Sequence, residues 1–278
     1  MSRDKNCVIG GSLVLLFTFL AVLAPVLAPH SPIETNFADS LLSPSTGYLF
    51  GTDSLGRDVF SRCLYGIRLS LLIAVSATSL ALAIALPLGS FAGFLGGISD
   101  VIIMRFIEIL LALPSILSAL IIVAMLGRGL MPVILAVAAR GIPVFAILAR
   151  NCILSLREED YVEAARAIGE RKSSILWRYI LPQLRPVILT QSSLYLATAI
   201  LTAAGLGFLG FSVDPPTPEL GILINDSKDF IRTAPWLVIF PGVMIAFIAL
   251  GFNRLGDGLN DVLNPRLRKE VMYEGSNV

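Results

Sequence analysis

Long uncharged, apolar blocks restrict what this chain can fold into. Hydrophobic residues make up 55% of its 278 residues and charged residues 15%, whereas soluble domains have about 25% charged residues. A block of about 20 apolar residues is long enough to cross a bilayer as a helix. We therefore predict an all-α, polytopic membrane protein.

Six blocks approach or exceed this length. The predicted spans are residues 7–28, 69–94, 101–126, 131–149, 186–213 and 235–252. Residues 1–6 then form a short cytoplasmic N-terminus, and residues 7–278 form a single transmembrane domain with outer loops 29–68 and 214–234. We interpret the first block as a retained helix, because the apolar core of a signal peptide has only about 7–15 residues.

The distribution of basic residues predicts the orientation. An even number of spans puts both termini on one side. With the termini inside, fourteen of the 21 Lys and Arg residues lie on the cytoplasmic side and six on the outside, with Arg140 in mid-span. Basic residues favour the cytoplasmic side, so we predict cytoplasmic termini and a cytoplasmic position for the charged loop 150–185.

The charged loop is predicted to form two short helices joined at Gly169, which permits a tight turn. Asp160 is expected to cap the first helix, and Ser173 or Ser174 the second, over residues 175–181. From the residues alone, two interpretations stand equal: an amphipathic hairpin bound to lipid headgroups, or a docking site for a soluble partner.

The same loop resembles the cytoplasmic EAA signature of permease subunits in ABC-type importers. The similarity rests on Glu163, Ala164, Ala165, Gly169, Leu181 and Pro182. Tyr179 stands where the signature usually has isoleucine.

A second motif lies in the first outer loop. Gly51 and Gly56 permit tight turns there, and Thr52 or Asp53 could cap a helix. The motif resembles one in the dipeptide/oligopeptide/nickel branch of these permeases, and its residues are Gly51, Thr52, Asp53, Gly56, Arg57 and Asp58. Further similarity to that branch occurs, in order along the chain, at residues 155–161, 208–211, 215–219, 252–258 and 264–267.

This resemblance implies a permease subunit of an ATP-driven importer. Its partners would be a second permease subunit, two cytoplasmic ATPase subunits that receive the EAA loop as a coupling helix, and a periplasmic or lipid-anchored substrate-binding protein. The cargo would be a di- or oligopeptide, or else nickel or a chelated metal, crossing the bacterial cytoplasmic (inner) membrane. The chain has no Gly-rich lysine loop of the nucleotide-binding type. We therefore expect no catalytic residue and no bound cofactor in this chain, with ATP used by the partner subunits, and no nucleic acid partner.

Ionisable residues inside membrane spans are costly to bury, so each one is a candidate functional residue. Arg105 and Glu108 are three residues apart, so they share a helix face and can form an intramembrane pair. Arg140 has no evident partner in its own helix. Related permeases often have arginine at the position of Ile147 and tryptophan at that of Leu220. The three cysteines and the single histidine have no metal-like spacing, so no metal site is predicted.

Two alternatives to an ABC permease are a secondary transporter and a membrane-embedded enzyme. A secondary transporter driven by an ion gradient should show inverted repeats and carboxylates near the midplane, and Glu108 is the one candidate carboxylate. A membrane-embedded enzyme would need a constellation of His, Ser or Cys residues, which the sequence does not show.

Overall fold

The structure is a computed structural model that describes residues 2–263. The motif at residues 264–267, and the end of the predicted domain 7–278, lie outside the described residues. Within residues 2–263 the regular elements are all helical, apart from a single antiparallel bridge between Thr52 and Asp58. This confirms the all-α fold class. The α-helices are α1 (Ser2–Val22), α2 (Ala24–Leu27), α3 (Val59–Leu95), α4 (Gly97–Ala112), α5 (Ser115–Leu126), α6 (Leu130–Leu156), α7 (Asp160–Ala167), α8 (Lys172–Ser174), α9 (Arg185–Phe208), α10 (Leu220–Ser227) and α11 (Trp236–Leu263).

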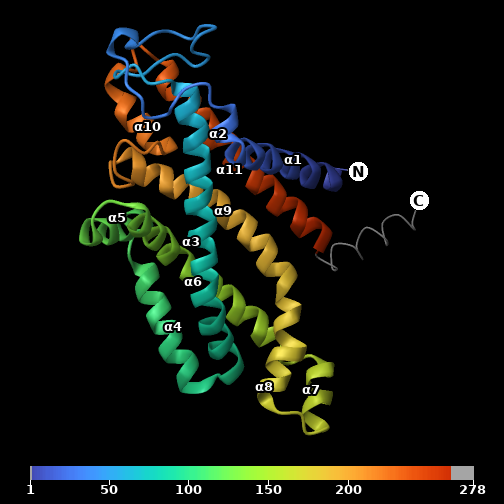
Figure 1. The fold of residues 1–278 in the computed structure, drawn as a ribbon. Coiled ribbons are helices and arrows are strands. Elements are labelled where there is room, and N and C mark those ends of the chain that lie inside the picture. Colours follow the sequence, from blue (N-terminus) through green and yellow to red (C-terminus); the bar gives the residue numbers. More distant parts are fainter. Residues whose placement is uncertain (1, 264–278) are drawn as a thin grey trace.

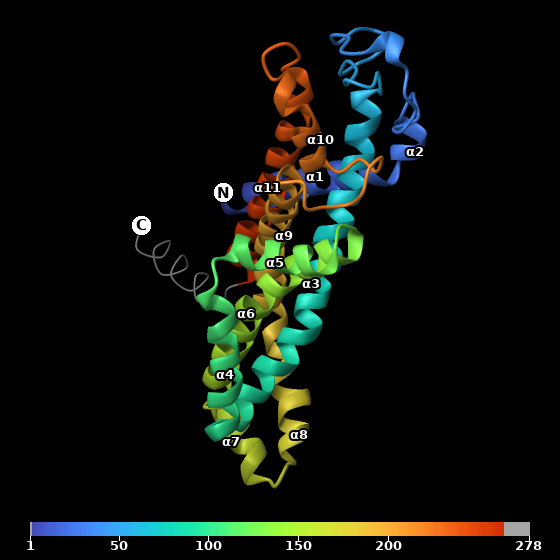
Figure 2. The ribbon, with the colours of Figure 1, turned by 90° about the vertical axis from the view of Figure 1, so that its left-hand side faces the viewer.

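The long helices form a bundle, and the two loops that carry sequence motifs lie at its opposite ends. Figure 1 shows the first outer loop and α10 gathered at one end of the long helix α3, with α7 and α8 at the other end. The view in Figure 2 shows the same separation. Within residues 2–263, five helices are long and apolar enough to cross a membrane, and α4 with α5 would count as a sixth if the pair is one span.

Small residues bring α3 and α6 into backbone contact. A Cβ atom added at Gly89 of α3 would lie 2.3 Å from the carbonyl oxygen of Ala146 on α6, and one at Gly93 would lie 2.8 Å from that of Arg150. Gly141 of α6 similarly faces Ala81 and Tyr195. Small residues let membrane helices approach closely and gain dispersion contacts, because burial in lipid supplies no hydrophobic driving force.

A second close contact joins the two ends of the chain. α1 and α11 run side by side (Figure 1), and a Cβ atom at Gly10 would lie 2.3 Å from the backbone nitrogen of Leu255. At Gly258 an added Cβ would lie 2.5 Å from the backbone nitrogen of Cys7. The first helix is thus packed against the last.

The helices differ in their bounds from the predicted spans, and α6 and α11 run on to Leu156 and Leu263, past the predicted ends at 149 and 252. α3 begins at Val59, ten residues before the predicted start at 69, because the Asp58 side chain accepts hydrogen bonds from the Phe60 and Ser61 amides and caps the helix there. The predicted span 101–126 is divided into α4 and α5, which meet at 90°. Proline disfavours helical backbone at the residue before it, and Leu113, before Pro114, is extended. α9 ends at Phe208 rather than 213.

We expect Gly89→Ala to destabilise the bundle, since the added Cβ collides with a backbone carbonyl rather than a flexible side chain. Overpacking of this kind costs about 1–3 kcal/mol, and the gain in helix propensity offsets about 1 kcal/mol of it. The measurement is the thermal midpoint of the purified protein in detergent. Gly242→Ala on α11 is the matched control, because nothing lies within 4 Å of its added Cβ. Equal midpoints for the two variants would contradict the packing role of Gly89.

Candidate functional site

The helix α7 carries the EAA residues and uses one face to pack on the bundle. Val162 and Ala165 are buried, whereas Glu163, Ala164 and Ala167 are exposed. The outward face therefore combines the small side chains of Ala164 and Ala167 with charged ones such as Glu163. The first residue outside α7 is Glu159, and neither it nor the predicted cap Asp160 makes a capping hydrogen bond through its side chain. Asp160 instead lies in the first turn, where its charge complements the helix dipole.

Gly169 ends this helix with a defined turn. Its φ is +82°, a backbone conformation that favours glycine. The Glu170 amide donates to the Ala165 carbonyl at 3.1 Å and the Gly169 amide to the Arg166 carbonyl at 3.0 Å. These two bonds are the pair that defines a Schellman motif. The direction of the chain leaving α7 is consequently fixed by hydrogen bonds.

The return toward the membrane is more irregular than the sequence suggests. The α8 turn is followed by a π-helical segment, Ile175–Ile180, and a 3-10 turn, Leu181–Leu184, that leads into α9. Neither Ser173 nor Ser174 caps a helix with its side chain, since the cap position before α8 is Arg171. Leu181 and Pro182 are half-buried at the start of the 3-10 turn.

A small hydrophobic core holds these pieces together. We call α7, α8 and the segment through Leu184 the elbow. Its buried residues Val162, Ala165, Ile175 and Ile180 form one cluster with Ala149, Ile153, Leu176 and Leu184. Because Ala149 and Ile153 belong to α6, the elbow is packed directly on a membrane helix.

Polar contacts tie the elbow end of the bundle together. Arg150 of α6 makes two 2.5 Å hydrogen bonds to the Asp100 carboxylate of α4. Arg157 donates to the Gly93 carbonyl at 3.3 Å, and Arg166 of α7 donates to the Arg157 carbonyl at 3.2 Å. A surface hollow of about 590 Å³ lies beside Glu163, bordered by Arg157, Glu158 and Arg166.

The outer motif forms a compact cap at the opposite end. Gly51 and Gly56 have φ values of +73° and +72°, and an added Cβ at Gly56 would lie 1.7 Å from the Asn36 carbonyl oxygen. The Thr52 hydroxyl accepts from the Leu42 amide at 2.8 Å and donates to the Asp39 carbonyl. Thr52 thus joins two parts of the loop, and the helix cap predicted for Thr52 or Asp53 is made by Asp58 instead.

Asp53 is the charge centre of this cap. It accepts from the Leu55 and Arg57 amides at 2.9 and 3.0 Å and from Arg57 Nε at 2.7 Å. Arg62 Nε lies 3.5 Å from the same carboxylate and Arg62 Nη1 donates to the Pro32 carbonyl. Asp53, Arg57 and Arg62 are all buried, so the carboxylate compensates two cations away from solvent.

Glu219 belongs to the motif at residues 215–219, and the sequence alone predicts no role for it. It is completely buried where α10 begins. Its two carboxyl oxygens accept from Ser70 Oγ of α3 at 3.2 Å and from the Ile222 amide at 3.1 Å, and an added Cβ at Gly207 of α9 would lie 2.2 Å from it. Burial raises the pKa of Glu219, against the hydrogen bonds that lower it. The signal available in the sequence was an acidic residue two before Gly221, in a helix-capping position.

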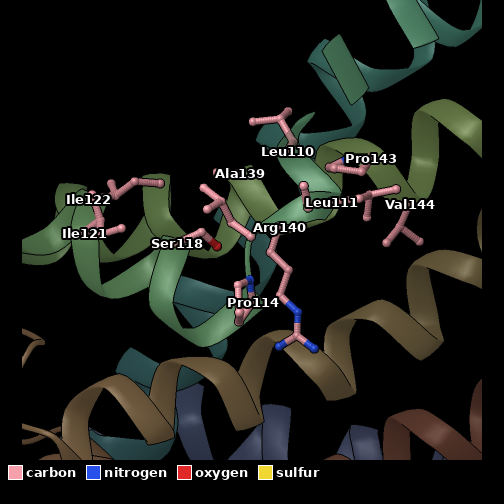
Figure 3. Close-up of a pocket in the computed structure, with 12 residues that line it drawn as sticks. Leu110, Leu111, Pro114, Ser118, Ile121, Ile122, Ala139, Arg140, Pro143 and Val144 are labelled. Carbon is pink, nitrogen blue, oxygen red and sulfur yellow. The ribbon is translucent and has the colours of Figure 1, made fainter. Parts of the chain in front are cut away.

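The charged residues of the spans separate into two kinds. Arg105 Nη1 and Glu108 Oε2 are 2.8 Å apart, and both side chains are exposed, at 76% and 59%. Arg140 is half-buried and donates from Nη1 to Thr202 Oγ1 of α9 at 2.6 Å. It borders a cavity of about 640 Å³ between α4, α5 and α6, shown in Figure 3.

Among the described residues, no group of three His, Cys, Asp or Glu side chains could hold a metal ion.

Comparisons with known proteins found matches over most of the chain. Residues 85–269 match the family described as binding-protein-dependent transport system inner membrane component, and residues 1–44 match the N-terminal TM domain of oligopeptide transport permease C. The dipeptide transport system permease protein DppC of Alkalihalophilus pseudofirmus is 42% identical, over 96% of this chain and 88% of its own. The glutathione transport system permease protein GsiD of Escherichia coli is 41% identical, over 96% of this chain and 88% of its own.

A solved structure shows the same fold. A chain of the inward-facing MetNI methionine ABC transporter superposes with a TM-score of 0.60 at 19% identity, and the match covers 72% of this chain and 94% of that chain. The two chains thus share a helical architecture at low sequence identity.

We expect Asp53→Asn to destabilise the outer cap by about 3 kcal/mol, because it leaves the buried Arg57 without a carboxylate partner and leaves the buried Arg62 only Asp226, at 3.9 Å. The measurement is the thermal midpoint together with protease cleavage of the first outer loop. Glu34→Gln is the control, since it removes a carboxylate from an exposed position of the same loop. Unchanged protease resistance in Asp53→Asn would contradict the role of Asp53 as charge centre.

We expect the stability contribution of Glu219 to decrease as pH rises. Its pKa is raised in the folded protein from an ordinary value of 4.5, so the folded state binds the proton more tightly than the unfolded chain, and stability is lost above that pH. The measurement compares the thermal midpoints of the wild type and Glu219→Gln from about pH 4 to 8. The wild type should lose stability relative to the variant across this window. A relative gain by the wild type would mean that Glu219 is held as a charged carboxylate.

Proposed function

The chain belongs to the family of binding-protein-dependent transport system inner membrane components, and from this premise we propose that it carries short peptides across the cytoplasmic membrane. Membership makes it a multi-span permease subunit of an ABC importer, a class that works with ATPase and substrate-binding partners. The peptide assignment is supported by relatives whose names state dipeptide and glutathione transport.

The observation that supports this mechanism is the packing of the elbow on α6. Val162 and Ala165 anchor α7 in the cluster that includes Ala149 and Ile153 of α6, while Glu163 and Ala164 face outward. The small side chain of Ala164 on this face allows a partner backbone to approach closely. We infer that an ATPase subunit receives α7 and moves it, and that the shared core passes the displacement to α6.

The proposed assembly has one such elbow for each of two permease subunits. The second permease is a different chain, two ATPase subunits hydrolyse ATP, and this chain binds no cofactor and has no catalytic residue. Both termini and the elbow lie in the cytoplasm, and the outer cap around Asp53 and Arg57 faces the binding protein. The excess of Lys and Arg at the elbow end supports this orientation.

The first test is transport by the whole complex in proteoliposomes. Uptake of a labelled dipeptide should require ATP on the side of the proteoliposome membrane where the ATPase subunits lie. It should persist in the presence of an uncoupler. Uptake that continues without ATP and stops with the uncoupler would favour a secondary transporter over the proposed function.

We expect Gly169→Asp to reduce transport to background while the subunit remains inserted and assembled. Nothing lies within 4 Å of the Cβ position, so the effect comes from the φ of +82°, where a non-glycine residue costs about 1–2 kcal/mol, and from a negative charge at the C-terminal end of α7. The measurement is dipeptide uptake together with ATPase activity of the complex.

Gly97→Asp is the matched control. Gly97 also has a positive φ, +58°, and open space at its Cβ position, but it lies at the start of α4, outside the elbow. It should retain transport. Full transport by Gly169→Asp would refute the coupling role of the elbow.

A further inference from the structure

The cavity beside Arg140 lies at the middle of the predicted spans. Arg140 is ten residues into α6, about 15 Å from Leu130 at 1.5 Å per residue. The break between α4 and α5, at Leu113 and Pro114, forms part of the lining. Non-helical backbone at membrane depth is tolerated where it is buried in protein or lines a water-filled cavity. The break therefore fits a surface that is covered by protein or opens on water, rather than one that faces lipid.

The lining of this cavity is apolar except at two positions. Ser118 of α5 and Arg140 of α6 are its polar side chains, and the remaining lining residues are apolar residues of α4, α5, α6 and the break. Its volume of about 640 Å³ falls in the range of about 300–1,000 Å³ of small-molecule sites. In Figure 3 the Arg140 side chain leaves α6 and extends past Pro114.

The Arg140 guanidinium is held in place but keeps donors available. Thr202 Oγ1 donates its proton to the Thr198 carbonyl at 2.8 Å and accepts from Arg140 Nη1 at 2.6 Å. Within residues 2–263, no carboxylate lies within 4.0 Å of this guanidinium, and its other N–H groups are not buried without a partner. These remaining donors have the planar geometry that binds a carboxylate through two hydrogen bonds.

We propose that Arg140 binds the terminal carboxylate of a short peptide as the peptide crosses the membrane, while the apolar walls accept the adjoining side chain. This inference rests on the proposed function. A cation in a low-dielectric surrounding attracts an anion strongly, and a carboxylate is the anionic group that every unmodified peptide carries. Thr202 acts as a positioning residue, because it fixes the direction of the guanidinium.

The experiment compares two forms of one labelled dipeptide, the free acid and the C-terminal amide, in proteoliposomes that contain the complete complex. The same binding protein delivers both peptides to both variants, so its own preference cancels when acid-to-amide uptake ratios are compared. We expect Arg140→Gln to lower this ratio about tenfold or more, since a hydrogen bond between charged groups contributes about 1.5–3 kcal/mol. Arg105→Gln, which removes an exposed arginine of α4, should leave the ratio unchanged.

Two further measurements keep the inference falsifiable. Arg140→Lys, which keeps the charge but loses the planar donors, should lower the ratio by less and serves if Arg140→Gln does not assemble. A dipeptide with a photoreactive group beside its carboxylate should label the cavity around Leu111 and Val144 in the wild type and lose that labelling in Arg140→Gln. Thr202→Val should lower the uptake ratio partially, and Thr202→Ser should restore it.

Several outcomes would overturn the inference. Equal losses of acid and amide uptake in the Arg140 variants would assign Arg140 a structural role, and loss of assembly in both variants would assign it a contact with the second permease. An unchanged ratio, or photolabelling outside the cavity, would also overturn it. If the wild type transports neither peptide form, the proposed function itself fails, which differs from a failure confined to Arg140.

Discussion

The close backbone contact between α3 and α6 is the constraint on which the rest of the structure depends. Lipid is as apolar as the side chains, so these helices are held by dispersion contacts that need small residues at the interface. Gly89 and Gly93 meet the backbone of α6 at successive turns. This contact fixes α6, and α6 in turn contributes Ala146 to the main core and Ala149 to the core of the elbow. One helix therefore connects the main core of the bundle with the elbow.

The two ends of the bundle are built from different interactions. The outer cap depends on buried charges and tight turns, with Asp53 compensating Arg57 and Arg62. The elbow depends on aliphatic packing and on a turn fixed by two backbone hydrogen bonds. A buried charge network has a single low-energy arrangement, since displacement leaves charges uncompensated. An aliphatic cluster has no charges to leave uncompensated when its helices shift, which fits the movement that we propose for the elbow.

The lengths of the apolar blocks and the composition predicted the membrane class and the helical fold, because long apolar blocks allow few other structures. The turn at Gly169 was predictable from the preference of glycine for positive φ. The sequence did not reveal that Asp58 caps α3, since Thr52, Asp53 and Asp58 are all chemically able to cap and only the folded loop selects among them. The 90° break at Pro114 was also missed, because a proline inside an apolar block is equally compatible with a mild kink. The role of Glu219 depends on its burial between α3 and α9, which the sequence alone does not predict.

Pro143, within α6, sets where that helix bends most easily. Proline has no amide hydrogen, so the intrahelical bond to the residue four before it is lost and the helix is locally compliant. Pro143 lies between Ala149, which packs on the elbow, and Arg140, which borders the cavity. If the elbow moves as proposed, a displacement of the elbow end of α6 would change the angle of the helix at Pro143, one turn from Arg140. Mechanical work done at one end of this helix would thus reorient a single positive charge, the Arg140 guanidinium, near the middle of the membrane.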